Sequence, residues 1–142
     1  ELYKVMGQSA ELGIDRRQAL NRFYFSVFVA IFVSISFVIQ TPSETFPTVV
    51  VVSAALVLGL LDSILWLANI FAARRLNASK YEAICELEKE FEYAPFTREW
   101  EFHVAAGRNF PQFTLIEILL PAALASICLV LFSLVALGLL TL

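Results

Sequence analysis

Three long apolar stretches, at residues 23–40, 48–73 and 113–142, constrain this chain more than any other feature. A helix needs about 20 mostly apolar residues to cross a hydrocarbon core that is about 30 Å thick. Of the 142 residues in the chain, 59% are hydrophobic and only 16% are charged. Soluble domains contain about 45–50% apolar and about 25% charged residues. The sequence therefore predicts an all-α integral membrane protein with three transmembrane helices.

The basic residues predict how these spans are oriented. All 10 Lys and Arg residues lie in residues 1–22 and 74–112, and none lies in the short turn at 41–47. Lys and Arg are preferentially retained on the cytoplasmic side of transmembrane helices. We therefore expect residues 1–22 and 74–112 to be cytoplasmic, and the turn and the C-terminus to be periplasmic.

The long segment between the second and third spans has the pattern of a helical layer rather than of a loop. Neither Gly nor Pro interrupts residues 60–93, and apolar residues recur at helical spacing from Ile84 to Phe91. The second span is thus predicted to continue below the membrane for about 25 Å, at about 1.5 Å per residue. Pro95 is expected to stop it, and Thr97 to be the N-cap of a short helix that follows.

The N-terminal segment is predicted to join this layer. Residues 1–22 are expected to hold a short amphipathic helix that ends at Gly13, with Asp15 as the N-cap of the helix that enters the membrane. Together the cytoplasmic helices would form a collar that is too small to fold alone. We expect the collar to bury its apolar stripes against other copies of the chain, which favours a homo-oligomer.

Four polar residues in or beside the spans are candidates for a functional site. Asp62 and Glu117 are ionisable groups within the spans, where such residues usually face a bundle interior or a water-filled cavity. Arg22 is the expected cation for either carboxylate, and Asn69 is expected to make an inter-helix hydrogen bond. The four residues either form a proton, ion or substrate site or fix helix packing, and we favour packing.

Small residues at intervals of four positions predict where helices approach closely in lipid. This spacing occurs once on each predicted span and indicates tight packing within an oligomer. The residues are Ser26, Ala30 and Ser34 on the first span, Ala55 and Gly59 on the second, and Ala122 and Ser126 on the third.

Patterns of catalysis and cofactor binding are not found in the sequence. The single histidine, His103, has no partners at a metal-ligand spacing, and Cys85 and Cys128 lie far apart. No phosphate loop, dinucleotide fingerprint or nucleophile elbow is present. We therefore predict no enzyme, no metal and no cofactor, and the net charge of -3 gives no reason to expect nucleic-acid binding.

Short motifs along the chain resemble the bacterial RipA family of octameric membrane proteins. They are Tyr3-Lys4, the stretch Asp15-Arg16-Arg17-Gln18-Ala19-Leu20-Asn21, Trp66, then Asn77, Lys80, Ile84 and Glu88, and finally Glu99-Trp100-Glu101. The usual Leu-Pro pair at the end of the projecting helix is replaced here by Ala94-Pro95. The resemblance implies a ring of eight three-span subunits in the bacterial inner membrane, with no assigned catalytic activity. Family members are tied to envelope physiology and to survival inside host cells.

A ring would bring charged collar residues of neighbouring subunits together. Lys80 or Arg98 of one subunit is expected to meet Glu88 or Glu99 of the next, in pairs that are individually weak but can set register. The leading hypothesis is a non-enzymatic, homo-oligomeric inner-membrane protein that organises the membrane or envelope and contacts lipids. One alternative is a pore or transporter for ions or small solutes that uses Asp62 or Glu117. Another is a membrane-acting effector of bacterial defence.

Overall fold

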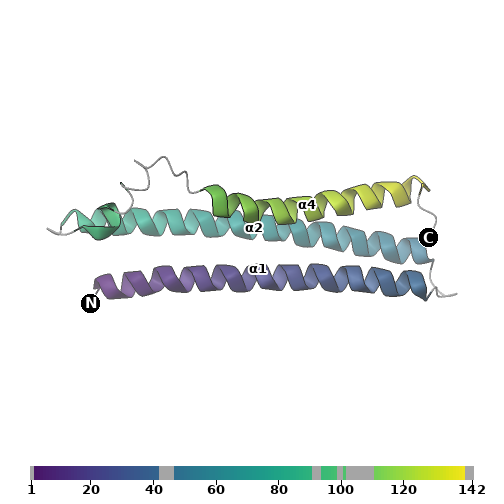
Figure 1. The fold of residues 1–142 in the computed structure, drawn as a ribbon, viewed down its shortest axis with the longest axis horizontal. Coiled ribbons are helices and arrows are strands. Elements are labelled where there is room, and N and C mark those ends of the chain that lie inside the picture. Colours follow the sequence, from purple (N-terminus) through teal and green to yellow (C-terminus); the bar gives the residue numbers. More distant parts are fainter. Residues whose placement is uncertain (1, 42–46, 91–93, 99–100, 102–110, 140–142) are drawn as a thin grey trace.

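The computed structural model describes residues 2–41, 47–90, 94–98, 101 and 111–139. Three long helices account for most of them: α1 (Leu2–Gln40), α2 (Thr48–Glu88) and α4 (Pro111–Ala136) (Figure 1). No strand occurs in the described part of the chain. The helices run back and forth along one common direction. The start of α1 and the end of α2 therefore lie at one end of the bundle, opposite the end of α4.

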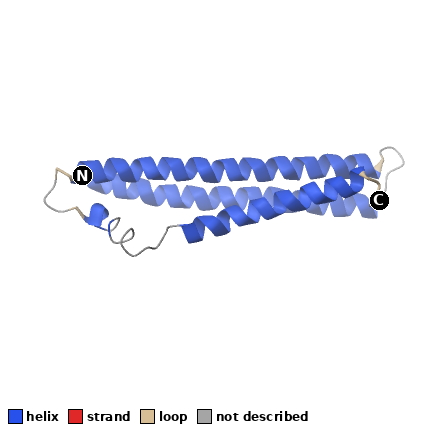
Figure 2. Ribbon diagram, turned by 90° about the horizontal axis from the view of Figure 1, so that it is seen from above, coloured by secondary structure: helices blue, strands red, loops and turns tan. Residues whose placement is uncertain are grey.

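The central helix is α2, which packs against both α1 and α4. α1 and α2 lie nearly parallel over their whole length, whereas α4 is inclined to them in the second view (Figure 2). This arrangement leaves most of each helix surface without a neighbour in the same chain. Of the most apolar window in each helix, only 6% in α1, 28% in α2 and 17% in α4 is buried inside the subunit.

Each helix contains a stretch that is long and apolar enough to cross a membrane. These stretches lie within Asp15–Gln40, Thr48–Glu88 and Glu117–Ala136, where the most apolar windows of 18 residues have mean hydropathies of 2.2, 2.3 and 2.6. Large side chains such as Phe37 and Val33 are more than 60% exposed on them, which only a lipid or protein surrounding can stabilise. The predicted all-α membrane fold with three candidate spans is confirmed.

The predicted break in the N-terminal segment is wrong, because α1 continues through Gly13 and Asp15 as one helix. A glycine inside a helix costs only about 1 kcal/mol relative to alanine, and tertiary packing can offset this. Gly13 faces α2 here, where a Cβ atom would lie 3.5 Å from the Oδ1 atom of Asn77. Asp15 is exposed within the helix and does not begin it.

α2 continues past Arg75 as one helix, as the sequence predicts, but it ends at Glu88 and not at Pro95. The backbone N–H groups of Lys89 and Glu90 each bond to a carbonyl three residues earlier, which tightens the last turn. Residues 95–98 form a short helical segment of their own. Pro95 therefore begins that segment, where its missing N–H is not needed, instead of stopping α2.

The third predicted span is too long, because α4 ends at Ala136. Gly138 adopts a φ of 67°, which is the left-handed conformation that favours glycine. The N–H of Gly138 bonds to the carbonyl of Val135, and the N–H of Leu139 bonds to that of Leu134. These two bonds satisfy carbonyls at the end of the helix and identify a Schellman motif.

The small interior of the subunit lies where the three helices meet in the apolar half. Its buried residues are Phe28 on α1, Val52 and Leu56 on α2, and Cys128 on α4. Gly59 of α2 lies at the same level, and a Cβ atom there would come within 3.0 Å of the Sγ atom of Cys128. Glycine is therefore what allows α2 and α4 to approach this closely.

We expect the substitution Gly59→Ala to lower the thermal midpoint of the detergent-solubilised protein, because the added methyl group overpacks the contact with Cys128. Overpacking of this kind costs about 1–3 kcal/mol. The matched control is the double variant Gly59→Ala/Cys128→Ala, which removes the opposing sulfur atom and should recover most of the loss. Additive losses in the double variant would show that Cys128 is not the neighbour that limits space at this position.

Candidate functional site

The carboxylate of Glu117 joins α4 to α1 through three contacts. Its Oε2 atom lies 2.5 Å from Nη2 of Arg17. Its Oε1 atom accepts hydrogen bonds from Nε of Arg17 at 3.2 Å and from Nδ2 of Asn21 at 3.4 Å. The side chains of Arg17 and Glu117 are only 25% and 23% exposed. The Oε1 contacts are hydrogen bonds, whereas the Oε2 contact is an ion pair without hydrogen-bond geometry. Partial shielding from solvent strengthens the attraction between the two charges.

Asn21 also bonds to a residue of α2. Its Oδ1 atom accepts a hydrogen bond of 2.8 Å from the indole N–H of Trp66, while its Nδ2 atom donates to Glu117. Trp66 is 3% exposed, and a buried indole N–H needs an acceptor. One amide therefore links all three helices.

A second pair of residues extends the network along α1 and α2. The rings of Tyr24 and Trp66 stack with their centroids 6.1 Å apart and their planes at 13°. Asn69 donates from Nδ2 to the hydroxyl of Tyr24 at 2.5 Å and to the carbonyl of Leu65 at 3.0 Å. We call the six residues of this network the three-helix cluster; they are Arg17, Asn21, Tyr24, Trp66, Asn69 and Glu117.

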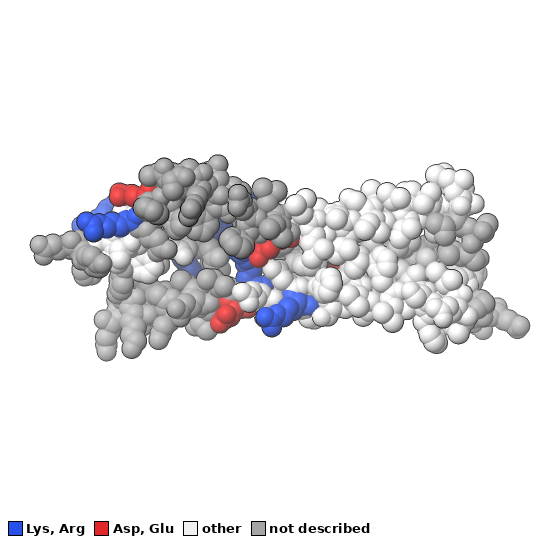
Figure 3. Space-filling model, in the orientation of Figure 1, with Lys and Arg blue, Asp and Glu red and all other residues white. Residues whose placement is uncertain are grey.

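The cluster lies at the border between the charged and the apolar halves of the molecule. Glu117 is the last charged residue of α4, and only uncharged residues follow it in this helix. In the space-filling view the charged side chains gather over one half, while the described residues visible on the other half are almost all uncharged (Figure 3). A polar group that moves into the apolar half costs free energy unless it keeps a hydrogen bond. The cluster therefore fixes how the three helices are positioned along one another.

Arg22 does not have the role that the sequence suggested. Its side chain is exposed, and its backbone carbonyl accepts a hydrogen bond from the hydroxyl of Ser26. Arg17 is the cation that pairs with Glu117. With 3.6 residues per turn, Arg22 points about 140° around the helix from Arg17. Residues 17, 21, 24 and 28 share one face of α1, and this spacing is the signal that could have identified Arg17 from the sequence.

Asp62 lies on α2 one turn from Trp66 but does not join the cluster. It is 9% exposed, and its Oδ2 atom is buried without a hydrogen-bond partner among the described residues. The neighbouring Ser63 is fully buried and donates its hydroxyl to the carbonyl of Gly59. Glu117 Oε2 also lacks a hydrogen bond, so the two carboxylates differ in their cation: Glu117 is ion-paired with Arg17, whereas Asp62 has no ion pair with a described residue.

The small residues predicted for helix packing fall into two groups. Gly59 is buried, and Ala55 and Ala122 are half-buried inside the subunit. Ser26, Ala30, Ser34 and Ser126 are instead exposed, and the three serines bond back to carbonyls one turn earlier in their own helices. The stripe on α1 lies about 150° around the helix from the three-helix cluster, at about 100° per residue.

The predicted collar residues are partly placed. Ile84 and Glu88 are buried, Asn77 and Lys80 are half-buried, and Glu101 is exposed, whereas Glu99 and Trp100 lie outside the described residues. The carboxylate of Glu88 accepts hydrogen bonds from the backbone N–H groups of Phe96 and Thr97, at 2.9 and 2.6 Å, and from the Thr97 hydroxyl at 2.6 Å.

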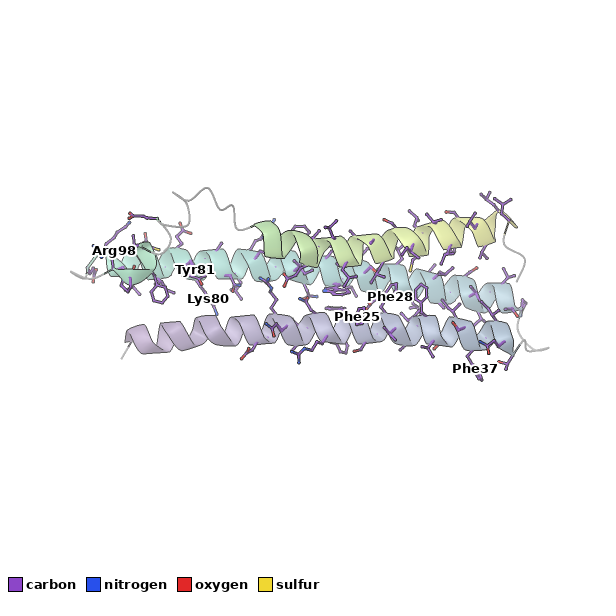
Figure 4. The ribbon with its side chains drawn as sticks, viewed as in Figure 1. Phe25, Phe28, Phe37, Lys80, Tyr81 and Arg98 are labelled. Carbon is purple, nitrogen blue, oxygen red and sulfur yellow. The ribbon has the colours of Figure 1, made fainter. Side chains whose placement is uncertain are left out.

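Glu88 therefore caps the segment at residues 95–98, where the first backbone N–H groups have no partner within the helix. The prediction that Thr97 is the N-cap is wrong, because Thr97 donates to the cap instead. The Glu88 side chain is 2% exposed and is bonded within its own chain. The pairing of Lys80 or Arg98 with Glu88 or Glu99 of a neighbouring subunit stays a prediction, and Glu99 lies outside the described residues. Arg98 is exposed at this end of the bundle (Figure 4).

Comparison with known protein families identifies the family of this chain. A family model described as the octameric membrane protein family (8xMP) matches residues 1–137, which is nearly the whole chain. No curated protein matches the chain, and no solved structure matches it.

The ion pair between Arg17 and Glu117 can be tested by neutralising its carboxylate. We expect Glu117→Gln to lower the free energy of unfolding by about 1.5–3 kcal/mol, the usual value of a hydrogen bond to a charged group. The change is read from the thermal midpoint in detergent. Glu82→Gln makes the same chemical change at an exposed position of α2 and should leave the midpoint unaltered.

The double variant Arg17→Gln/Glu117→Gln replaces the ion pair by two neutral amides and should be more stable than Glu117→Gln alone. Equal midpoints for Glu117→Gln and Glu82→Gln would contradict the role given to this pair.

Proposed function

The chain belongs to the octameric membrane protein family, and on this premise we propose that it is a non-enzymatic scaffold of the bacterial inner membrane. It assembles as a ring of identical subunits and organises the membrane or envelope around it. The observation that carries this proposal is the three-helix cluster, because its polar groups bond to one another within the subunit. The carboxylate of Glu117 is bonded to Arg17 and Asn21, so it holds helices together and is not available to exchange protons or bind a substrate.

The exposed stripe on α1 supports assembly from copies of the chain. Ser26, Ala30 and Ser34 present a narrow surface of small residues that α2 and α4 leave uncovered. Their hydroxyls are satisfied within α1, so the stripe can enter a dry contact with another helix. We therefore assign this stripe to the contact between neighbouring subunits.

The distribution of charge supports a cytoplasmic collar. The described basic residues lie on the first part of α1, on the last part of α2 and at Arg98, which share one end of the bundle. By the positive-inside rule this end is cytoplasmic, and the turn between α1 and α2 is periplasmic.

Asp62 favours a second candidate function, an ion or small-solute pathway. A buried carboxylate with a partnerless oxygen is unusual in any protein and costly at hydrocarbon depth. It would serve as a proton or cation site if a neighbouring subunit completed it. We rank this function second because the other intramembrane carboxylate, Glu117, is held in an ion pair.

The stripe on α1 predicts a change in subunit number. Ala30→Leu should separate the octamer into smaller species, because a large side chain prevents close helix approach in lipid. The measurement is the mass of the detergent-solubilised complex by native mass spectrometry. Ala30→Ser keeps the residue small and should remain octameric. If Ala30→Leu remains an octamer, the stripe does not form the contact between subunits.

The scaffold and the pathway predict different behaviour in liposomes. For the scaffold, reconstituted protein should give no more proton or K⁺ flux than empty vesicles, and Asp62→Asn should change nothing. For the pathway, the unsubstituted protein should conduct, and Asp62→Asn should reduce the flux while the octamer persists. The second result would overturn the proposal of a scaffold.

A further inference from the structure

A cleft of about 410 Å³ lies between α1 and α2 in the charged half of the bundle. This volume is within the range of sites that hold small molecules, about 300–1,000 Å³. Three of the residues that line it, Gly13, Ala72 and Ala73, have little or no side chain. They leave open the space that larger residues would fill between two nearly parallel helices.

The lining of this cleft carries positive charge from both helices. Arg16 and Arg17 come from α1 and Lys80 comes from α2, while neither Asp nor Glu is among the lining residues that the structure describes. Lys80 lies on the side of α2 that faces α1 (Figure 4). The side chain of Arg17 lines the cleft but is bound to Glu117, whereas the side chain of Arg16 is exposed. The side-chain amide of Asn77 adds a hydrogen-bonding group between the cations.

The depth of the cleft relates it to the membrane surface. Its end at Arg17 and Asn69 belongs to the three-helix cluster, at the level of Glu117, the last charged residue of α4. From Asn69 to Lys80 the cleft extends along α2 for about 16 Å, at about 1.5 Å per residue. Leu76, which also lines it, is 58% exposed. A ligand in the cleft would therefore touch cations and apolar side chains at the boundary of the hydrocarbon layer.

We propose that this cleft binds the phosphate group of an anionic phospholipid, with Arg16 and Lys80 as the principal ligands. A guanidinium offers paired N–H groups to phosphate oxygens, and an ammonium adds a compact charge. A lipid, rather than free phosphate, fits the site because the exposed Leu76 can contact the glycerol and acyl region. The proposal depends on the level of the cleft relative to the spans and not on which side of the membrane the collar occupies.

The test titrates the intact, detergent-solubilised oligomer with three probes: short-chain phosphatidylglycerol, short-chain phosphatidylcholine and inorganic phosphate. Binding is followed as the rise in thermal midpoint with ligand concentration. Phosphatidylglycerol should stabilise the protein at the lowest concentration. The double variant Arg16→Gln/Lys80→Gln should bind it about thirtyfold more weakly, because each cation near the surface contributes about fivefold.

The matched control is Arg75→Gln, which removes one charge from an exposed position of α2 outside the cleft and should leave the affinity unchanged. If the double variant does not assemble, two milder variants make the same test. Arg16→Lys/Lys80→Arg should bind as the unsubstituted protein does, and Arg16→Gln alone should bind about fivefold more weakly.

Three results would overturn the proposal. Equal stabilisation by inorganic phosphate would identify free phosphate as the ligand. Equal stabilisation by phosphatidylcholine would show that the anion is not recognised. A loss of affinity in Arg75→Gln as large as that in Arg16→Gln would place binding outside the cleft.

Discussion

The contact between Glu117 and Arg17 is the interaction on which the rest of this structure depends. A carboxylate at the edge of a hydrocarbon layer needs a cation and hydrogen-bond donors, and α1 supplies both from one face. Asn21 extends the contact to Trp66, so the position of α4 along α1 also sets the position of α2. Because apolar side chains alone allow helices to slide in lipid, this polar contact gives the three helices one defined register.

The same constraint accounts for the two halves of the molecule. On the apolar side of the cluster, helices meet through the close approach at Gly59, and most large side chains face outward. On the charged side, α1 and α2 continue beyond the start of α4 and leave the basic cleft between them. So little of each span is buried within the subunit that lipid and neighbouring subunits must cover the remainder.

The sequence predicted the parts of the fold that depend on hydropathy and on helix continuity. The three spans and the unbroken α2 follow from long apolar stretches and from the absence of Gly and Pro between Gly59 and Pro95. Prediction from the sequence failed where a contact between distant residues outweighs a local preference of the chain. Gly13 does not end a helix because α2 packs beside it, and Glu88 caps a segment that lies eight residues further along the chain. Arg17 was missed because the prediction chose Arg22, the basic residue nearest to the first span, as the partner of the carboxylates. It did not use the helical spacing from residue 17 to residues 21, 24 and 28.

An electron cryo-microscopy map of the oligomer in lipid nanodiscs, at a resolution that shows side chains, tests the central claim most directly. The account predicts that Glu117 contacts Arg17 and Asn21 of its own subunit, with the indole of Trp66 on Asn21, at the edge of the lipid belt. A map in which Glu117 faces the centre of the ring, or pairs with a residue of the adjacent subunit while Arg17 is turned into solvent, would contradict it.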